Sequence, residues 1–128
     1  MARRKGGAAV PGTRCHIDIG ADGTHAWRLT ATNGRVIAMA AVTYQGYDEC
    51  RAAFERLCAE VRYLPGAVHH TSEGSGWVWR LRDRAGGAVA VSSRAYERHS
   101  TCQAAYERFR ALLTELGAGG AIPWDDTE

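Results

Sequence analysis

The feature that most constrains the fold of this chain is an internal repeat with an offset of 52 residues. Shifting the sequence against itself by that offset places Trp27-Arg28-Leu29 on Trp79-Arg80-Leu81, and the match continues without a gap. Twelve identities result, where about three would be expected by chance in a chain rich in Ala and Arg. The other identical pairs are Gly34/Gly86, Ala38/Ala90, Tyr44/Tyr96, Cys50/Cys102, Ala52/Ala104, Ala53/Ala105, Glu55/Glu107, Arg56/Arg108 and Ala59/Ala111. We therefore predict a disordered basic tail at residues 1–12, a first repeat at 13–65 and a second repeat at 66–128.

The two repeats are expected to share one core. A chain of 128 residues should bury roughly two-thirds of its unfolded surface, which is enough for a core without disulfides or metals. A unit of three strands and one helix buries its sheet face poorly by itself. We therefore expect a pseudo-dimer within one chain, in which both units contribute to one sheet and both helices cover the same side.

Alternating apolar residues and turn signals predict three short strands at the start of each repeat. Trp27 and Leu29 share one strand face, and Ile37 and Met39 are expected to share a face of the next strand. Asn33-Gly34 between them predicts a type I′ hairpin turn, which needs positive φ at both central residues. The predicted strands span residues 15–19, 25–30 and 35–41, and then 68–71, 77–82 and 88–93.

One amphipathic helix follows the strands in each repeat, because apolar residues recur there at the helical period. Asp48 is the predicted N-cap of the first helix. Ser100, with Gln103 three residues later, predicts a capping box at the start of the second. The two apolar stripes consist of Cys50, Phe54, Leu57, Cys58, Val61 and Leu64, and of Cys102, Tyr106, Phe109, Leu113 and Leu116.

This combined pattern resembles the YegP-like family of small bacterial and archaeal proteins over about residues 14–127. The resemblance consists of Trp-Arg-Leu, Asn-Gly, small residues, Tyr and a helix opening at Cys, twice in tandem, and it closes on Ile122-Pro123-Trp124-Asp125-Asp126-Thr127. It implies an α+β fold of two tandem β-β-β-α-β repeats. These would form one antiparallel sheet with two helices packed on one face and the C-terminal strands exchanged between the repeats.

On this view residues 122–124 pair with strands of the first repeat. Residues 63–71 then carry both the last strand of the first repeat and the first strand of the second. The family has no established catalytic activity, so it supplies no site residues. The chain departs from the pattern where Ala85 replaces Asn33 in the second hairpin, and Pro123 limits the last strand to an edge or to its non-donating side.

Charge and composition argue against several function classes. The 16 basic and 14 acidic residues give a net charge of +2, too small an excess to indicate a polyanion partner. Since Lys5 is the only lysine, a P-loop, a Schiff-base lysine and a Ser/Lys pair are not expected. The sequence contains no apolar run that could span a bilayer, and the N-terminus lacks the apolar stretch of a signal peptide. We expect a cytoplasmic protein with reduced cysteines and no membrane partner.

A line of arginines is the best functional lead. Arg28 and Arg80 point away from the tryptophans, and Arg80, Arg82 and Arg84 alternate along one strand. If the helices cover only the opposite face, these guanidinium groups could bind phosphate or carboxylate in a bidentate manner. The plainer interpretation is a solvated sheet face with partners such as Asp83, and it is the one we favour.

The tryptophans and helix-start cysteines also have plainer explanations. Trp27 and Trp79 could stack on nucleobases, but their alternation with leucines favours core packing. Cys50 and Cys102 lie in first helical turns, where the helix dipole could lower a thiol pKa. Because both also belong to the apolar stripes, buried structural thiols are the preferred interpretation.

Neither a metal site nor a catalytic constellation is expected. Cys15-His16 and His69-His70 are adjacent pairs whose members face opposite sides of a strand, and the chain has no CxxC, HxxxH or HExxH spacing. We therefore predict a non-enzymatic module, without a cofactor, that binds a ligand or assembles with itself through its sheet face or edges. The alternative is a nucleic-acid or anionic-ligand binder that uses Arg28, Arg80, Arg82 and Arg84, with nucleic acid the less favoured partner. A small enzyme is a third possibility.

Overall fold

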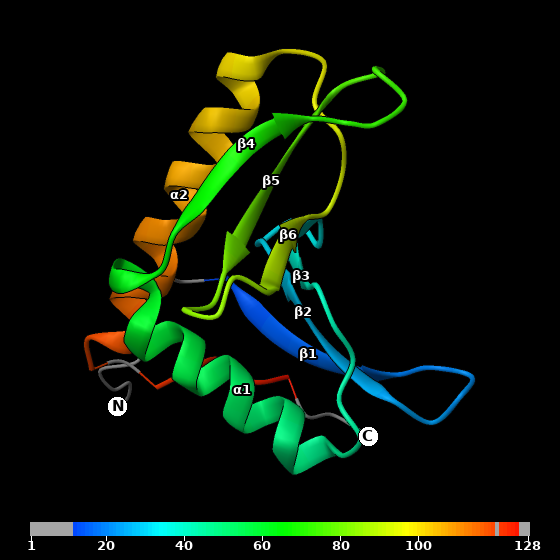
Figure 1. The fold of residues 1–128 in the computed structure, drawn as a ribbon. Helices are drawn as coiled ribbons and strands as arrows, with labels where there is room; N and C mark the ends of the chain where they lie inside the picture. The colour runs from blue at the N-terminus through cyan, green and yellow to red at the C-terminus, as the bar shows by residue number, and fades with distance from the viewer. Residues whose placement is uncertain (1–11, 120, 126–128) are drawn as a thin grey trace.

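The computed structural model describes residues 12–119 and 121–125. Within these residues the chain forms one six-stranded antiparallel sheet and two α-helices (Figure 1). The first half contains β1 (Arg14–Ile19), β2 (His25–Thr30), β3 (Val36–Ala40) and α1 (Tyr47–Glu60), which is followed by a 3-10 turn at Val61–Tyr63. The second half contains β4 (Gly66–His70), β5 (Trp77–Arg82), β6 (Ala88–Ser92) and α2 (His99–Gly117). The predicted α+β class is present, and the expectation for the tail at 1–12 lies almost wholly outside the described residues.

The strand order β1-β2-β3-β6-β5-β4 places β3 against β6, so that each half is a three-stranded meander and the two meet at the centre of the sheet. The register follows the offset of 52. Leu29 lies opposite Ala38 and Leu81 opposite Ala90, and in each half the register shifts directly after that leucine. The predicted strands agree with the observed ones to within two residues, β4 differing most because it begins at Gly66.

One core lies between the sheet and the helices, which Figure 1 shows on the same side of the sheet. Trp27 packs edge-on against Phe54 of α1 with ring centroids 4.9 Å apart, and Trp79 stacks on Phe109 of α2 at 4.5 Å. Every residue of the two predicted apolar stripes is buried. The helices therefore follow from the sequence pattern, and burial of their apolar faces is the main source of stability.

Two predictions about β3 and the turn before it are wrong. In the described part of the chain only glycines have positive φ, so Asn33-Gly34 is not a type I′ turn; Gly34 alone has φ of 85°. This arrangement is typical of a type I turn followed by a bulge. The register shift leaves Ile37 without a partner residue, and Ile37 packs partly against the core, whereas Met39 is 38% exposed. The predicted shared face of Ile37 and Met39 therefore does not form.

The predicted N-caps are also wrong, because each helix begins two residues earlier. The cap residues are Gly46 and Arg98, both with extended backbone, and neither makes a side-chain capping hydrogen bond. Asp48 lies inside the first turn of α1, where its charge still favours the positive end of the helix dipole. Ser100 lies inside α2, and the Gln103 amide donates to Glu107 at 2.9 Å rather than closing a capping box.

The C-terminal segment covers the outer edge of β1. The Cys15 N–H donates to the Pro123 carbonyl at 3.0 Å, and the Asp125 N–H donates to the Cys15 carbonyl at 2.8 Å, which makes one parallel bridge. Pro123 contributes only its carbonyl, as an edge position requires. Between residues 63 and 71 the structure contains one strand, β4, which pairs with β5 alone. The exchange of C-terminal strands implied by the family resemblance is therefore not confirmed.

Candidate anion-binding groove

The structure separates the four arginines that the sequence predicts to act together. The Arg28 side chain forms a bidentate ion pair with Asp18, with Nε 2.8 Å from Oδ2 and a terminal nitrogen 3.1 Å from Oδ1. Hydrogen bonding to Arg28 lowers the pKa of Asp18, so both groups are charged and neutralise each other at neutral pH. Arg28 is therefore already paired with a carboxylate of its own chain.

The remaining three arginines do not form a line. Arg80 is exposed, and no described residue bonds to its side chain. Arg82 donates to the Gly86 carbonyl at 3.1 Å. Because β5 ends at Arg82, Arg84 lies in the following turn and not on the strand face. Arg28 and Arg80 share the open face, but β3 and β6 lie between their strands, which separates them by about 14 Å.

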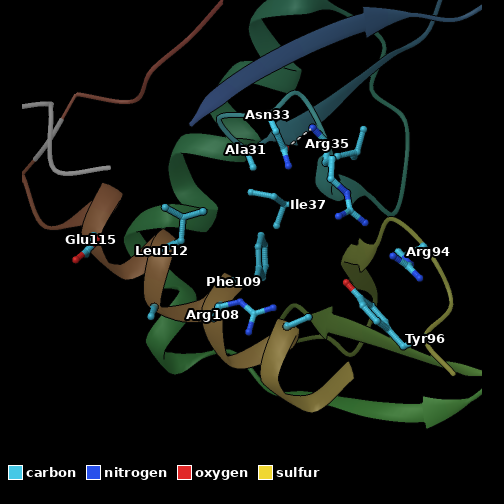
Figure 2. Close-up of a pocket in the computed structure, with 13 residues that line it drawn as sticks. Ala31, Asn33, Arg35, Ile37, Arg94, Tyr96, Arg108, Phe109, Leu112 and Glu115 are labelled. Atoms are coloured by element: carbon cyan, nitrogen blue, oxygen red, sulfur yellow. Dashed lines mark hydrogen bonds between the residues drawn. The ribbon is translucent and has the colours of Figure 1, made fainter. Parts of the chain in front are cut away.

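A groove on the other side of the sheet brings together a different set of arginines. It lies where the β2–β3 turn and the loop before α2 meet the exposed side of α2, and its volume is about 680 Å³. We call it the α2 groove (Figure 2). Its lining residues are Ala31, Asn33, Arg35, Val36, Ile37, Arg94, Tyr96, Ala105, Arg108, Phe109, Ala111, Leu112 and Glu115.

Arg35, Arg94 and Arg108 are the cations of the α2 groove, and all three are exposed. The Arg94 guanidinium lies 5.0 Å from the centre of the Tyr96 ring, a cation–π contact that orients it. No ion pair joins any of the three to a carboxylate within residues 12–119 and 121–125. Figure 2 shows Arg35 and Arg94 at one end and Glu115 at the opposite end. The groove therefore has three positive charges available for an external anion.

The second half of the sheet forms a matching groove against α1, with a volume of about 380 Å³. We call it the α1 groove. Most of its positions correspond to those of the α2 groove at the offset of 52, but its charges differ. Arg56 stands where Arg108 stands, whereas Val42 replaces Arg94 and Gly87 replaces Arg35. Its lining residues are Trp27, Val42, Tyr44, Ala53, Arg56, Leu57, Glu60, Leu64, Asp83, Gly87, Ala88 and Val89.

The charge difference between the two grooves is large for such similar surfaces. The α2 groove has three arginines and one glutamate among its described lining residues, for a formal charge of +2. The α1 groove has one arginine with Glu60 and Asp83, for a formal charge of −1. Asp83 also accepts the N–H groups of Ala85 and Gly87 at 3.0 and 2.9 Å, so it has a structural role in its turn. An anion would distinguish the two grooves by charge alone.

The tryptophans and cysteines singled out in the sequence belong to the core. Trp27 is 1% exposed and Trp79 is 0% exposed, so neither offers a ring face to a ligand. Burial raises the pKa of Cys50 to about 11, and it also raises the pKa of Cys102. This is the opposite of the shift that an activated thiol needs.

The described residues contain no group of three or more His, Cys, Asp or Glu side chains that could hold a metal ion. None of their helices is both long and apolar enough to cross a membrane.

Sequence reasoning missed the α2 groove because its arginines are far apart in the chain. Arg35 follows the β2–β3 turn, Arg94 lies before α2, and Arg108 lies on α2. One signal was present in the sequence. Aligning the halves shows Arg35 against Gly87 and Arg94 against Val42, which are gains of charge at positions that the fold brings together.

Comparison with known proteins gives a fold and no activity. No family model matches the chain. No curated protein matches it either. The solution structure of yegP from E. coli, a protein of unknown function, superposes with a TM-score of 0.62 at 12% identity, covering 91% of this chain and 97% of that one. A UPF0339 protein from Shewanella oneidensis gives a TM-score of 0.63 at 13% identity, covering 88% and 91%. These likenesses show that the chain has a YegP-like fold.

Proposed function

We propose that the chain is a tandem repeat of one unit and that it acts as a non-enzymatic binding module whose α2 groove takes a small anionic ligand. The single observation that carries this proposal is the set of three arginines, Arg35, Arg94 and Arg108, around one groove without a carboxylate partner among the described residues. Guanidinium groups bind phosphate and carboxylate with fixed geometry, and hydrogen bonds to such ions are among the stronger ones in proteins.

The volume of the groove fits a small ligand. Sites for small molecules are typically concavities of about 300–1,000 Å³, and the α2 groove measures about 680 Å³. Its described lining residues include no His, Cys or Ser, so they provide no obvious nucleophile and base pair. Binding without chemistry is thus the function that these residues support best.

The open sheet face is the weaker candidate for the same ligand class. Of the four arginines first considered, Arg28 is paired with Asp18 and Arg82 with a carbonyl of its own turn. Arg80 remains as an exposed cation on that face. One exposed cation on an open sheet face binds an anion far less well than three around one concave surface.

The test is a calorimetric titration with phenyl phosphate, which carries a dianionic head on a compact ring. We expect one saturable site whose affinity falls as salt is raised. Arg108→Ala should weaken binding about tenfold or more, because it removes one of the three positive charges around the groove. Arg56→Ala is the matched control at the equivalent position of the α1 groove, and it should leave the affinity within about twofold.

Arg80→Ala tests the competing surface. It should also leave phenyl phosphate binding unchanged. If Arg80→Ala abolishes binding while Arg108→Ala does not, the ligand binds on the open sheet face and the groove proposal is overturned. Equal losses in Arg56→Ala and Arg108→Ala would likewise overturn it, because the two grooves would then be equivalent.

A further inference from the structure

The apolar wall of the α2 groove limits the class of anion that it can take. The apolar residues that line the groove include Ile37, Leu112 and Phe109. Ile37 and Leu112 are only partly buried, although both pack against the core. Apolar surface left open beside a charged cluster gains free energy when a ligand covers it.

The charges of the groove are arranged along its length. Figure 2 shows Arg35 and Arg94 grouped at one end, Ile37 and Leu112 in the middle, and Glu115 at the far end. Arg108 lies beside the apolar middle, on the α2 wall. A ligand lying in the groove would therefore meet cations at one end, hydrocarbon along its body and a carboxylate at the other end.

We infer that the ligand of the α2 groove is a single-headed amphipathic anion, with one phosphate or carboxylate head held by Arg35 and Arg94 and an apolar body lying on Ile37 and Leu112. This inference rests on the proposed function and specifies its ligand. Glu115 disfavours a second negative head at the far end of the groove, because like charges repel. The groove therefore selects its ligand by charge at both ends and by apolar contact in the middle.

The α1 groove shows which features are particular to the α2 groove. At the position of Leu112 it has Glu60, and at the position of Ala31 it has Asp83. A negatively charged middle and the loss of two arginines make it unsuitable for the same ligand. The α1 groove is therefore an internal control that is smaller but is formed largely by equivalent positions of the same molecule.

Three probes with the same head test the inference by calorimetry on the full chain: inorganic phosphate, hexyl phosphate and hexane-1,6-bisphosphate. We expect hexyl phosphate to bind about tenfold or more tightly than inorganic phosphate, because its methylene groups leave water. The bisphosphate should bind more weakly than hexyl phosphate, although it carries more charge. Glu115→Gln should restore bisphosphate binding and leave the affinity for hexyl phosphate within about twofold of the wild-type value.

Leu112→Ala separates the contribution of the apolar body to the affinity from that of the phosphate head. The variant should weaken the binding of hexyl phosphate and leave the affinity for inorganic phosphate unchanged, whereas Val42→Ala in the α1 groove should change neither affinity. If inorganic phosphate binds as tightly as hexyl phosphate, the ligand has no apolar body, and the inference fails while the anion site stands. If the bisphosphate binds the wild-type chain most tightly, the single-headed class is wrong. If none of the three probes binds, the proposed function fails together with the inference.

Discussion

The two halves of the molecule have the same buried hydrophobic residues on their central strands and differ in charge at the grooves. Trp27 and Trp79 occupy matching positions of β2 and β5, and both are buried against an aromatic ring of their own helix. At the rims of the grooves the same offset pairs Arg35 with Gly87 and Val42 with Arg94. Packing tolerates little change in a dense interior, whereas a solvent-exposed rim tolerates almost any side chain. The difference therefore indicates where the two halves are free to acquire separate roles.

Several core positions also differ, and at one of them the neighbouring residue changes as well. Cys15 lies opposite Leu29 in the first half, and Gly66 lies opposite Leu81 in the second. A side chain at Gly66 would collide with the Tyr106 hydroxyl, whereas the first half has Phe54 at the matching helix position. Arg110 donates to that hydroxyl at 3.0 Å and to the carbonyls of Leu64 and Val61. The second half thus fills with a tyrosine the space that the first fills with a cysteine.

The largest expected effect comes from breaking the part that the halves share. Trp27→Ala and Trp79→Ala should each lower the free energy of unfolding by about 3–5 kcal/mol, because each leaves a cavity beside a buried ring. Since there is one core, both variants should unfold in a single transition, as followed by denaturant titration with two probes. Two separate transitions in either variant would show that the halves fold independently.

A smaller effect is expected from making the second half resemble the first at one position. Gly66→Ala should cost about 1–3 kcal/mol, since its Cβ meets both the Tyr106 hydroxyl and the Arg80 carbonyl. Gly87→Ala is the control, because a Cβ there makes only ordinary contacts with Asp83, and it should change stability by less than about 0.5 kcal/mol. Equal midpoints for the two variants in urea would contradict the close packing at Gly66.

The effect that is smallest at neutral pH concerns the buried thiols, because it appears only in alkali. Burial raises the pKa of Cys50 to about 11 and that of Cys58 to about 12 from an ordinary value of 9.0, and it raises the pKa of Cys102 as well. A folded-state pKa above the unfolded one gives a contribution that is complete below pH 9 and is lost as the pH rises towards 11 or 12. The urea midpoint should therefore be flat near neutrality and fall above about pH 9.

Replacing either helix-start thiol should make that alkaline loss less steep, so Cys50→Ala and Cys102→Ala should behave alike. Alkylation with iodoacetamide at about pH 8 gives a second readout. Both thiols should react far more slowly than free cysteine in the folded chain. Rapid reaction of one of them would mean that one half has an activated thiol that the other lacks.

Local patterns predicted the elements and their buried faces, because spacing along the chain determines which residues share a side. Both apolar stripes are buried, and β2 and β5 span the predicted residues. The helix starts were less predictable, since Asp48 and Ser100 are good cap residues that the backbone places inside the first turn. Caps depend on the approach of the preceding loop, which propensity does not encode.

The candidate site was not predictable from local patterns. Alternation correctly placed Arg28 and Arg80 on the open face of the sheet. It could not show that Asp18, ten residues earlier, forms an ion pair with Arg28, or that β5 ends before Arg84. The α2 groove depends on contacts between a turn, a loop and a helix of different halves. Such a site appears only when the tertiary fold is known.

The central claim is that the α2 groove, and not its counterpart or the open sheet face, binds an anion. It is tested most directly by recording the arginine side-chain N–H signals by NMR while phenyl phosphate is added. The signals of Arg35, Arg94 and Arg108 should shift together and saturate at one equivalent, while those of Arg56 and Arg80 stay in place. Saturable shifts centred on Arg80 or on Arg56 instead would contradict the assignment of the site to the α2 groove.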